Sequence, residues 1–196
     1  GAAGKLLSAV KITQSVNANT SGIKGNLSKV TKFDLTGTAH LKLQKTITLG
    51  SGTFEHKTAN TQLEALTSNA GAASVLSGKT VTGTGTTLVN GLQDGVTNDL
   101  NNITGGTLAA PKLIASILSA MPNGLKGNLS TVNKITVADA ITVVIPSSGV
   151  TLPASNVGQM ILLGTNSLVT AANMTYLHSK KVNGNSTNLG KVQIVA

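Results

Sequence analysis

The densest group of side chains with chemical potential is Glu55, His56 and Lys57, three consecutive residues in a chain of 196. A carboxylate, an imidazole and an ammonium are groups that general acid-base catalysis uses. Neighbouring side chains on a strand point to opposite faces, however, and no partnered nucleophile is indicated. We therefore expect this stretch to be a solvated loop and not a catalytic site.

The rest of the chain offers few groups for catalysis or metal binding. Six carboxylates and three histidines are scattered along it, and cysteine is absent. Their spacing is typical of neither zinc nor calcium sites, and no thiolate site or disulfide is possible. We expect no catalytic residue, no metal site and no cofactor, and thus a protein that is not an enzyme.

All 15 basic residues are lysines, and the formal net charge is +9. This charge admits anionic partners such as cell-surface glycans. Arginine is absent and only three residues are aromatic, so the groups that read bases or stack on them are missing. We expect no specific nucleic-acid binding. No run of 18 apolar residues is present, so we also expect no transmembrane segment.

An internal repeat is the strongest pattern in the sequence. GIKGNLSKV at 22–30 returns as GLKGNLSTV at 124–132, and the match continues at an offset of 102 to residue 145. A second match, at an offset of 101, joins 76–88 with 177–189. We predict two divergent copies, 1–92 and 107–196, joined by a linker at 93–106 that is rich in Gly, Asn and Asp. No acid or histidine is paired between the aligned segments, which argues against a catalytic site in the ancestral unit.

The repeated GN step is interpreted as a structural turn formed by Gly25 and Asn26 in the first copy and by Gly127 and Asn128 in the second. Glycine can take positive φ, and asparagine can make a local side-chain turn. We place the step between the end of a helix and the first strand of a sheet. An anion-binding loop is disfavoured because a phosphate cradle should open a helix.

Helical spacing is clearest at 111–121, where apolar residues follow a proline and precede another. We predict a short amphipathic helix there and, with weaker spacing, helices within 5–16, 60–76 and 157–177.

The stretches 30–49 and 132–152 alternate apolar and polar residues, which indicates half-buried strands. The fold class predicted is a β-rich α+β protein, in which each copy of about 100 residues has short strands plus one or two short helices. A continuous β-solenoid is the alternative, because it also places every second strand residue inward.

TGTGTT at 82–87 admits two functional interpretations. A phosphate nest would need the Lys and Ser/Thr of a P-loop after it, and these are missing. A threonine row on a flat β-face could order water, because the Thr-x-Thr spacing resembles that of ice-binding proteins. We favour a β-turn or an edge strand.

Alternating strands such as KITVADAITVVI at 134–145, Ala/Leu-rich stretches and Gly/Asn/Thr turns together resemble the tandem units of large secreted prokaryotic surface proteins and adhesins. They resemble subunits of extracellular filaments less closely. The resemblance implies a structural or adhesive role outside the cell or at its surface. The start at Gly1, without a basic and apolar leader, indicates a processed mature chain or a chain from which the signal was removed. We expect a non-enzymatic subunit of a filament or surface layer whose partner is another copy of itself. An adhesin or glycan-binding module is the alternative.

The candidate assembly segment is KVQIVA, a short and β-prone stretch. It consists of Lys191, Val192, Gln193, Ile194, Val195 and Ala196. It could complete a sheet in a neighbouring subunit by strand addition, or form an edge strand of its own chain.

Overall fold

The structure is a computed structural model that describes residues 10–14, 22–65, 75–105, 113–153, 161–172, 177, 182–184 and 190–195. All elements with definite bounds in these ranges are β-strands, and only Val75 and Leu76 among the described residues are helical. The strands are β1 (Val10–Gln14), β2 (Ile23–Leu27), β3 (Val30–Leu35), β4 (His40–Leu49), β5 (Thr53–His56), β6 (Gln62–Ala65), β7 (Val81–Gly83), β8 (Thr86–Asn90), β9 (Ile103–Gly105), β10 (Leu113–Ile117), β11 (Gly127–Asn128), β12 (Lys134–Val137), β13 (Thr142–Ile145), β14 (Val150–Thr151), β15 (Ile161–Leu163), β16 (Leu168–Ala171), β17 (Val182–Gly184) and β18 (Lys191–Ile194).

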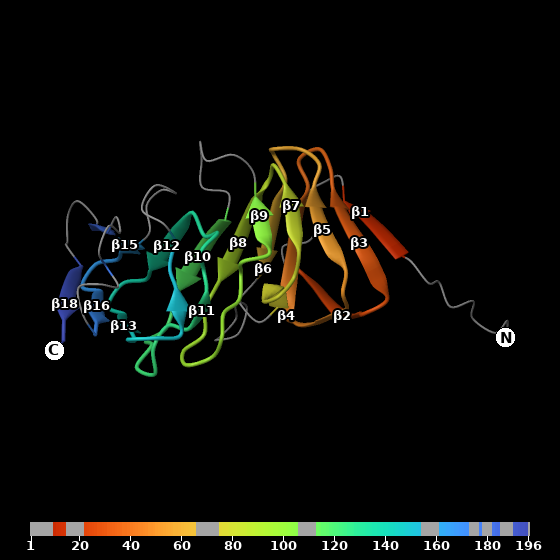
Figure 1. Ribbon diagram of the computed structural model, residues 1–196. Coiled ribbons are helices and arrows are strands. Elements are labelled where there is room, and N and C mark those ends of the chain that lie inside the picture. Colours follow the sequence, from red (N-terminus) through yellow and green to blue (C-terminus); the bar gives the residue numbers. More distant parts are fainter. Residues whose placement is uncertain are drawn as a thin grey trace, which may run out of the picture.

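These strands stack into a parallel β-solenoid, with the first strands at one end and β18 at the other (Figure 1). The long sheet runs in the order β17-β15-β12-β10-β8-β6-β4-β2. The N-terminal sheet is β1-β3-β5-β7-β9, the C-terminal sheet is β13-β16-β18, and β11 pairs with β14. Register partners lie 20 residues apart at Ile114 and Lys134 and 27 apart at Phe54 and Val81. One turn of the solenoid therefore takes about 20 to 27 residues.

The expected α+β fold with helices is wrong, and the alternative, a continuous β-solenoid, describes the chain. The predicted helix at 111–121 contains strand β10, in which Leu113, Ala115 and Ile117 are buried. Leu118, which a helix would turn toward its apolar face, is 48% exposed. The spacing of the apolar residues in this stretch fits both a helix and a strand. β8 and β12 form hydrogen bonds with β10 on its two sides, and this pairing decides in favour of the strand.

The described parts of the other predicted helices hold strands, apart from Val75 and Leu76, which are helical; residues 5–9, 15–16, 66–74, 157–160 and 173–176 lie outside the described residues. Strand β1 lies within 5–16, β6 within 60–76, and both β15 and β16 within 157–177. Alternation with period two was the decisive signal in these stretches. It was obscured because Ala, Leu and Met also suit helices.

The core is a set of inward ladders in which each side chain stacks on its register partner one turn away. In the long sheet one ladder runs Leu43, Ala65, Val89, Ala115 and Ile135, and all five are fully buried. Large and small side chains alternate along it, so neighbouring turns interdigitate. In the N-terminal sheet the rings of the register partners Phe33 and Phe54 stack with their centroids 4.4 Å apart.

The two sequence copies form the same strand-corner-strand unit on different sheets. In the first copy β3 belongs to the N-terminal sheet and β4 to the long sheet, whereas the aligned strands β12 and β13 belong to the long and the C-terminal sheet. The aligned pair β7 and β17 is displaced in the same direction. The corners match as well: Ala39 O accepts a hydrogen bond from Gln62 N at 2.8 Å, and the aligned Ile141 O accepts one from Leu168 N at 2.8 Å. Relative to the first copy, the second copy is thus rotated about the solenoid axis, so that each aligned strand lies in the next sheet.

The stretch 93–106 takes part in the solenoid. Strand β9 within it pairs with β7, and Leu100 and Ile103 are buried in the core. The side chain of Asn98 is also buried, at 1% exposure. Its amide donates to the carbonyl oxygens of Gln93, Val96 and Lys126 at 3.0 to 3.1 Å, and its Oδ1 accepts from Gln93 N at 2.9 Å. Asn98 therefore fastens the preceding loop to the next turn.

The strand assignment of β10 can be tested by two substitutions of neighbouring residues. Ile117→Lys buries an unpaired ammonium in the core and should lower the free energy of unfolding by about 4 kcal/mol or more. Leu118→Lys changes an exposed position and should shift it by no more than ~0.5 kcal/mol. Urea unfolding followed by circular dichroism measures both. Comparable losses in the two variants would contradict the strand.

Candidate functional site

Glu55 and His56 lie in strand β5 and not in the solvated loop that the sequence predicted; Lys57 follows directly and is exposed. The stacking of Phe54 on Phe33 fixes the register of this strand. Phe54 and His56 then point inward and Glu55 outward, because side chains alternate along a strand. The three adjacent groups are therefore divided between the core and the surface, and they do not form one site.

His56 is buried, and both of its ring nitrogens have hydroxyl partners. Nδ1 lies 2.8 Å from Thr61 Oγ1, and Nε2 lies 3.1 Å from Thr87 Oγ1. Thr61 Oγ1 donates to Thr58 O at 2.7 Å, so it accepts from Nδ1. A neutral imidazole then carries its proton on Nδ1 and accepts at Nε2 from Thr87. This arrangement satisfies buried polar groups.

Two glycines pack against His56, Gly85 against its imidazole ring and Gly83 against its backbone. A Cβ on Gly85 would lie 2.1 Å from His56 Nδ1, and one on Gly83 would lie 2.0 Å from His56 O. Gly83 is also the register partner of His56. The TGTGTT stretch thus supplies the close-packed wall of a buried histidine. Thr87 is buried at an inward position of β8.

The threonines of that stretch do not build a row across the described strands. Thr82 on β7 has Glu55 and Thr104 as its two register partners, so the row is interrupted at Glu55, and Thr86 on β8 has Gln62 as its partner. A repeating array of hydroxyl groups on one flat face is therefore not formed there. This differs from the water-ordering interpretation of the sequence.

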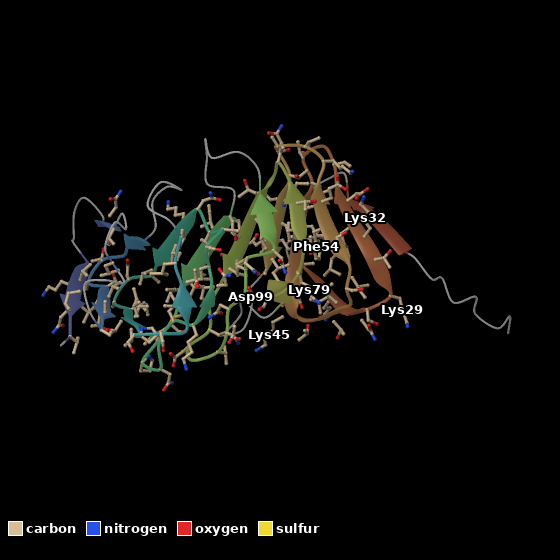
Figure 2. The ribbon with its side chains drawn as sticks, viewed as in Figure 1. Lys29, Lys32, Lys45, Phe54, Lys79 and Asp99 are labelled. Atoms are coloured by element: carbon tan, nitrogen blue, oxygen red, sulfur yellow. The ribbon has the colours of Figure 1, made fainter. Side chains whose placement is uncertain are left out.

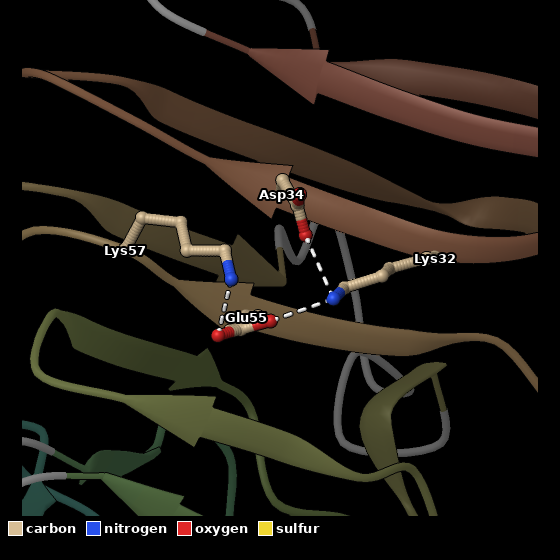
Figure 3. A network of polar contacts seen from close by, with 4 residues as sticks. All are labelled: Lys32, Asp34, Glu55 and Lys57. Atoms are coloured by element: carbon tan, nitrogen blue, oxygen red, sulfur yellow. Dashed lines mark hydrogen bonds and ion pairs between the residues drawn. The ribbon is translucent and has the colours of Figure 1, made fainter.

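On the outer face of the N-terminal sheet, Lys32, Asp34, Glu55 and Lys57 form an ion-pair network (Figure 3). Asp34 and Glu55 are register partners, so two carboxylates stand side by side on adjacent strands. Lys32 Nζ lies 2.8 Å from Glu55 Oε2 and 3.6 Å from Asp34 Oδ1, and Lys57 Nζ donates to Glu55 Oε1 at 2.5 Å. The lysines offset the repulsion between the acids.

The network shifts the pKa values of its members. The hydrogen bond from Lys32, followed by that from Lys57, lowers the pKa of Glu55 from 4.5 to about 2, against the opposing effect of burial. The hydrogen bond to Glu55 and the charge of Asp34 raise the pKa of Lys32. A carboxyl group with so low a pKa is a poor proton acceptor near neutral pH. The network is suited to holding strands in register.

A second polar network crosses the outer face of the long sheet. His40 Nε2 on β4 lies 2.7 Å from Glu64 Oε2 on β6, and Asn90 Nδ2 on β8 donates to Glu64 Oε1 at 2.8 Å. The described part of the chain holds no group of three or more His, Asp or Glu side chains that could bind a metal ion. The third histidine, His178, lies outside the described residues.

Gly25 and Gly127 have φ values of 106° and 114°, within strands β2 and β11. The expected position of the GN step between a helix end and the first strand is therefore wrong. Asn26 Oδ1 accepts from Ser28 N at 2.9 Å, and Asn128 Oδ1 accepts from Ser130 N at 3.1 Å. The two steps differ in their surroundings. A Cβ on Gly127 would lie 2.1 Å from Asn98 O, whereas one on Gly25 would meet nothing within 4 Å. Sequence alone shows the shared conformation but not this close approach.

The lysines that the structure describes differ in their surroundings. Lys79 Nζ donates to Gly50 O at 2.8 Å and thereby links two turns. Lys29 and Lys45 are exposed and lie on the lower side of the N-terminal half in Figure 2. Within the described ranges no helix has the length and apolar character needed to cross a membrane.

The candidate assembly segment forms β18, the outermost strand of the C-terminal sheet (Figure 1). Val192 and Ile194 are register partners of Val169 and Ala171, both of which are buried. They therefore continue the inward ladders of that sheet, yet they are 43% and 38% exposed, and Val195 is 49% exposed. No described strand lies beyond β18. Ala196 lies outside the described residues.

Comparison of the chain with protein-family models, with curated proteins and with solved structures finds no match.

The close approach at Gly127 leads to a paired test. Gly25→Ala and Gly127→Ala both place a Cβ at positive φ, which costs about 1 to 3 kcal/mol. Gly127→Ala also forces this atom against the Asn98 backbone and should lose a further ~1 to 3 kcal/mol. Chemical denaturation of both variants measures the difference. Equal losses would show that the turn at Gly127 has room.

The Glu55 network predicts a pH dependence of stability. Because the pKa of Glu55 is lowered in the folded state, its favourable contribution is complete above about pH 4.5 and is lost as the pH falls toward 2. The unfolding free energies of the parent and of Glu55→Gln should differ slightly at pH 7 and converge over this range. The difference should also shrink in 1 M salt, because these side chains are partly exposed. A difference that does not change with pH would contradict the ion pairs.

Proposed function

We propose that the chain is a non-enzymatic structural subunit that assembles end to end into a filament or layer outside the cell or at its surface. The observation that carries the proposal is the uncovered apolar end at β18. A solenoid normally needs a capping turn with a polar outer side to shield its core. At β18 the inward ladders instead end on exposed Val192 and Ile194.

The unpaired edge of β18 supports the same proposal. An exposed edge strand presents unpaired N–H and C=O groups to any strand that approaches. In natural proteins, charged residues, prolines or β-bulges prevent edge strands from pairing with other chains. In β18 only Lys191 is charged, and no proline or bulge interrupts the pairing with β16. Both the backbone and the inner face of this edge thus favour an added strand.

The location outside the cell rests on the resemblance of the alternating strands to secreted surface proteins. A role as an adhesin that binds anionic glycans through lysines stays a second prediction. It would give salt-sensitive binding by a monomer, whereas apolar stacking depends little on salt.

Removal of Lys191–Ala196 should abolish assembly through this contact, because it takes away the strand that carries Val192 and Ile194 and leaves β16, one turn further back, as the edge. Negative-stain electron microscopy and light scattering measure the result. Ile194→Lys keeps the strand but places a charge on the ladder, and it should reduce assembly strongly. Val96→Lys is the matched control, since Val96 is 47% exposed but lies away from this edge. Unchanged filaments after the deletion, or equal loss in the control, would contradict the proposal.

A further inference from the structure

The covalent junction between the two copies shows how an end of this solenoid is covered. β8 is the last strand that the first copy adds to the long sheet, and β10 is the first strand of the second copy. They pair in parallel, with Thr87 opposite Leu113 and Val89 opposite Ala115. All four residues are buried.

By its place in the stack, and not by the sequence offset of 101, β18 is the counterpart of β8 in the second copy. β8 pairs with β6 so that Thr87 and Val89 lie opposite Leu63 and Ala65. β18 pairs with β16 so that Val192 and Ile194 lie opposite Val169 and Ala171. In each copy, the strand follows the aligned strands β7 and β17 along the chain.

β1 is likewise the counterpart of β10. Ala115 of β10 has Ile135 as its register partner, and Ile12 of β1 has Phe33. Phe33 and Ile135 are aligned at the repeat offset of 102. Ile12 therefore occupies the register position in the first copy that Ala115 occupies in the second.

We propose that β18 of one chain pairs in parallel with β1 of the next chain, with Ile194 opposite Ile12 and Gln193 opposite Lys11. The pairing repeats the β8–β10 junction between molecules. It rests on the proposed end-to-end assembly and specifies the partner strand and its register. The C-terminal sheet of one chain then continues as the N-terminal sheet of the next.

Burial supports this pairing. Thr87 and Val89, which β10 covers, are 1% and 0% exposed, whereas the corresponding Val192 and Ile194 are 43% and 38% exposed. Both pairs of residues occupy the same inward positions. The pair on β8 is covered by β10, whereas no described strand covers the pair on β18. A parallel strand from a second copy provides that cover and satisfies the free backbone groups of β18.

The contact joins two different ends of the molecule, so it is head to tail. β1 and β18 lie at opposite ends of the stack (Figure 1). Each added chain therefore leaves a new β18 edge exposed. A heterologous contact that advances along an axis does not close and produces an open filament.

Cysteine cross-linking tests the register, because the chain has no cysteine of its own. The single variants Lys11→Cys and Gln193→Cys are mixed in equal amounts, allowed to assemble and oxidised. Register partners on parallel strands lie about 4.8 Å apart, within the range that a disulfide spans. A disulfide-linked dimer should form in the mixture and be absent when either variant is oxidised alone.

Lys191→Cys mixed with Lys11→Cys is the matched control. It is on the same strand and face as Gln193→Cys but two residues out of register, about 8 Å away, and should cross-link at least tenfold less. Equal cross-linking of the two mixtures would overturn the register. Homodimers of Gln193→Cys alone would overturn the head-to-tail contact.

Electron microscopy of the same samples separates this inference from the proposed function. Filaments without the 11–193 cross-link would overturn the β18–β1 pairing and leave end-to-end assembly intact. Neither filaments nor cross-links at any concentration would overturn both.

Discussion

The inward stacking of register partners is the constraint on which the rest of this structure depends. Each turn must return a side chain of suitable size to the same position about 4.8 Å further along the axis. The ladder from Leu43 through Ala65 and Val89 meets this requirement by alternating large and small residues. Turns of unequal length are tolerated because the extra residues lie between the strands. The aliphatic composition follows from the same requirement, since β-branched side chains fit a pleated surface.

The outer networks and the buried histidine follow from that stacking. Phe33 and Phe54 set the register of β3 and β5, and this brings Asp34 next to Glu55 and turns His56 toward Thr87. The lysines beside the acids then compensate a repulsion that the register imposes. Charged groups here stabilise the pairing of strands, and the polar group inside is fully hydrogen bonded.

Features that depend on local pattern could be predicted from the sequence, and features that depend on strand pairing could not. The alternation in 132–152 and the conformation of the GN steps are local, and they could be predicted. The stretch around Leu113 fits both helical and strand spacing, and only its neighbours β8 and β12 decide between them. Asp34 and Glu55 are 21 residues apart and become neighbours only through the length of one turn. The role of Asn98 was equally hidden, because its partners come from two turns. The candidate edge at β18 was visible as a β-prone segment, but its place at the end of the inward ladders was not.

The parallel stacking also determines how the molecule responds to force. The bonds between turns run along the solenoid axis, with the first and last strands at opposite ends (Figure 1). Tension between these ends acts on the inter-turn bonds in series, so all of them carry the same load and the weakest contact between turns opens first. Each turn of 20 to 27 residues releases roughly 70 to 95 Å of extended chain. The solenoid would therefore behave as an extensible tether that yields one turn at a time and dissipates mechanical work.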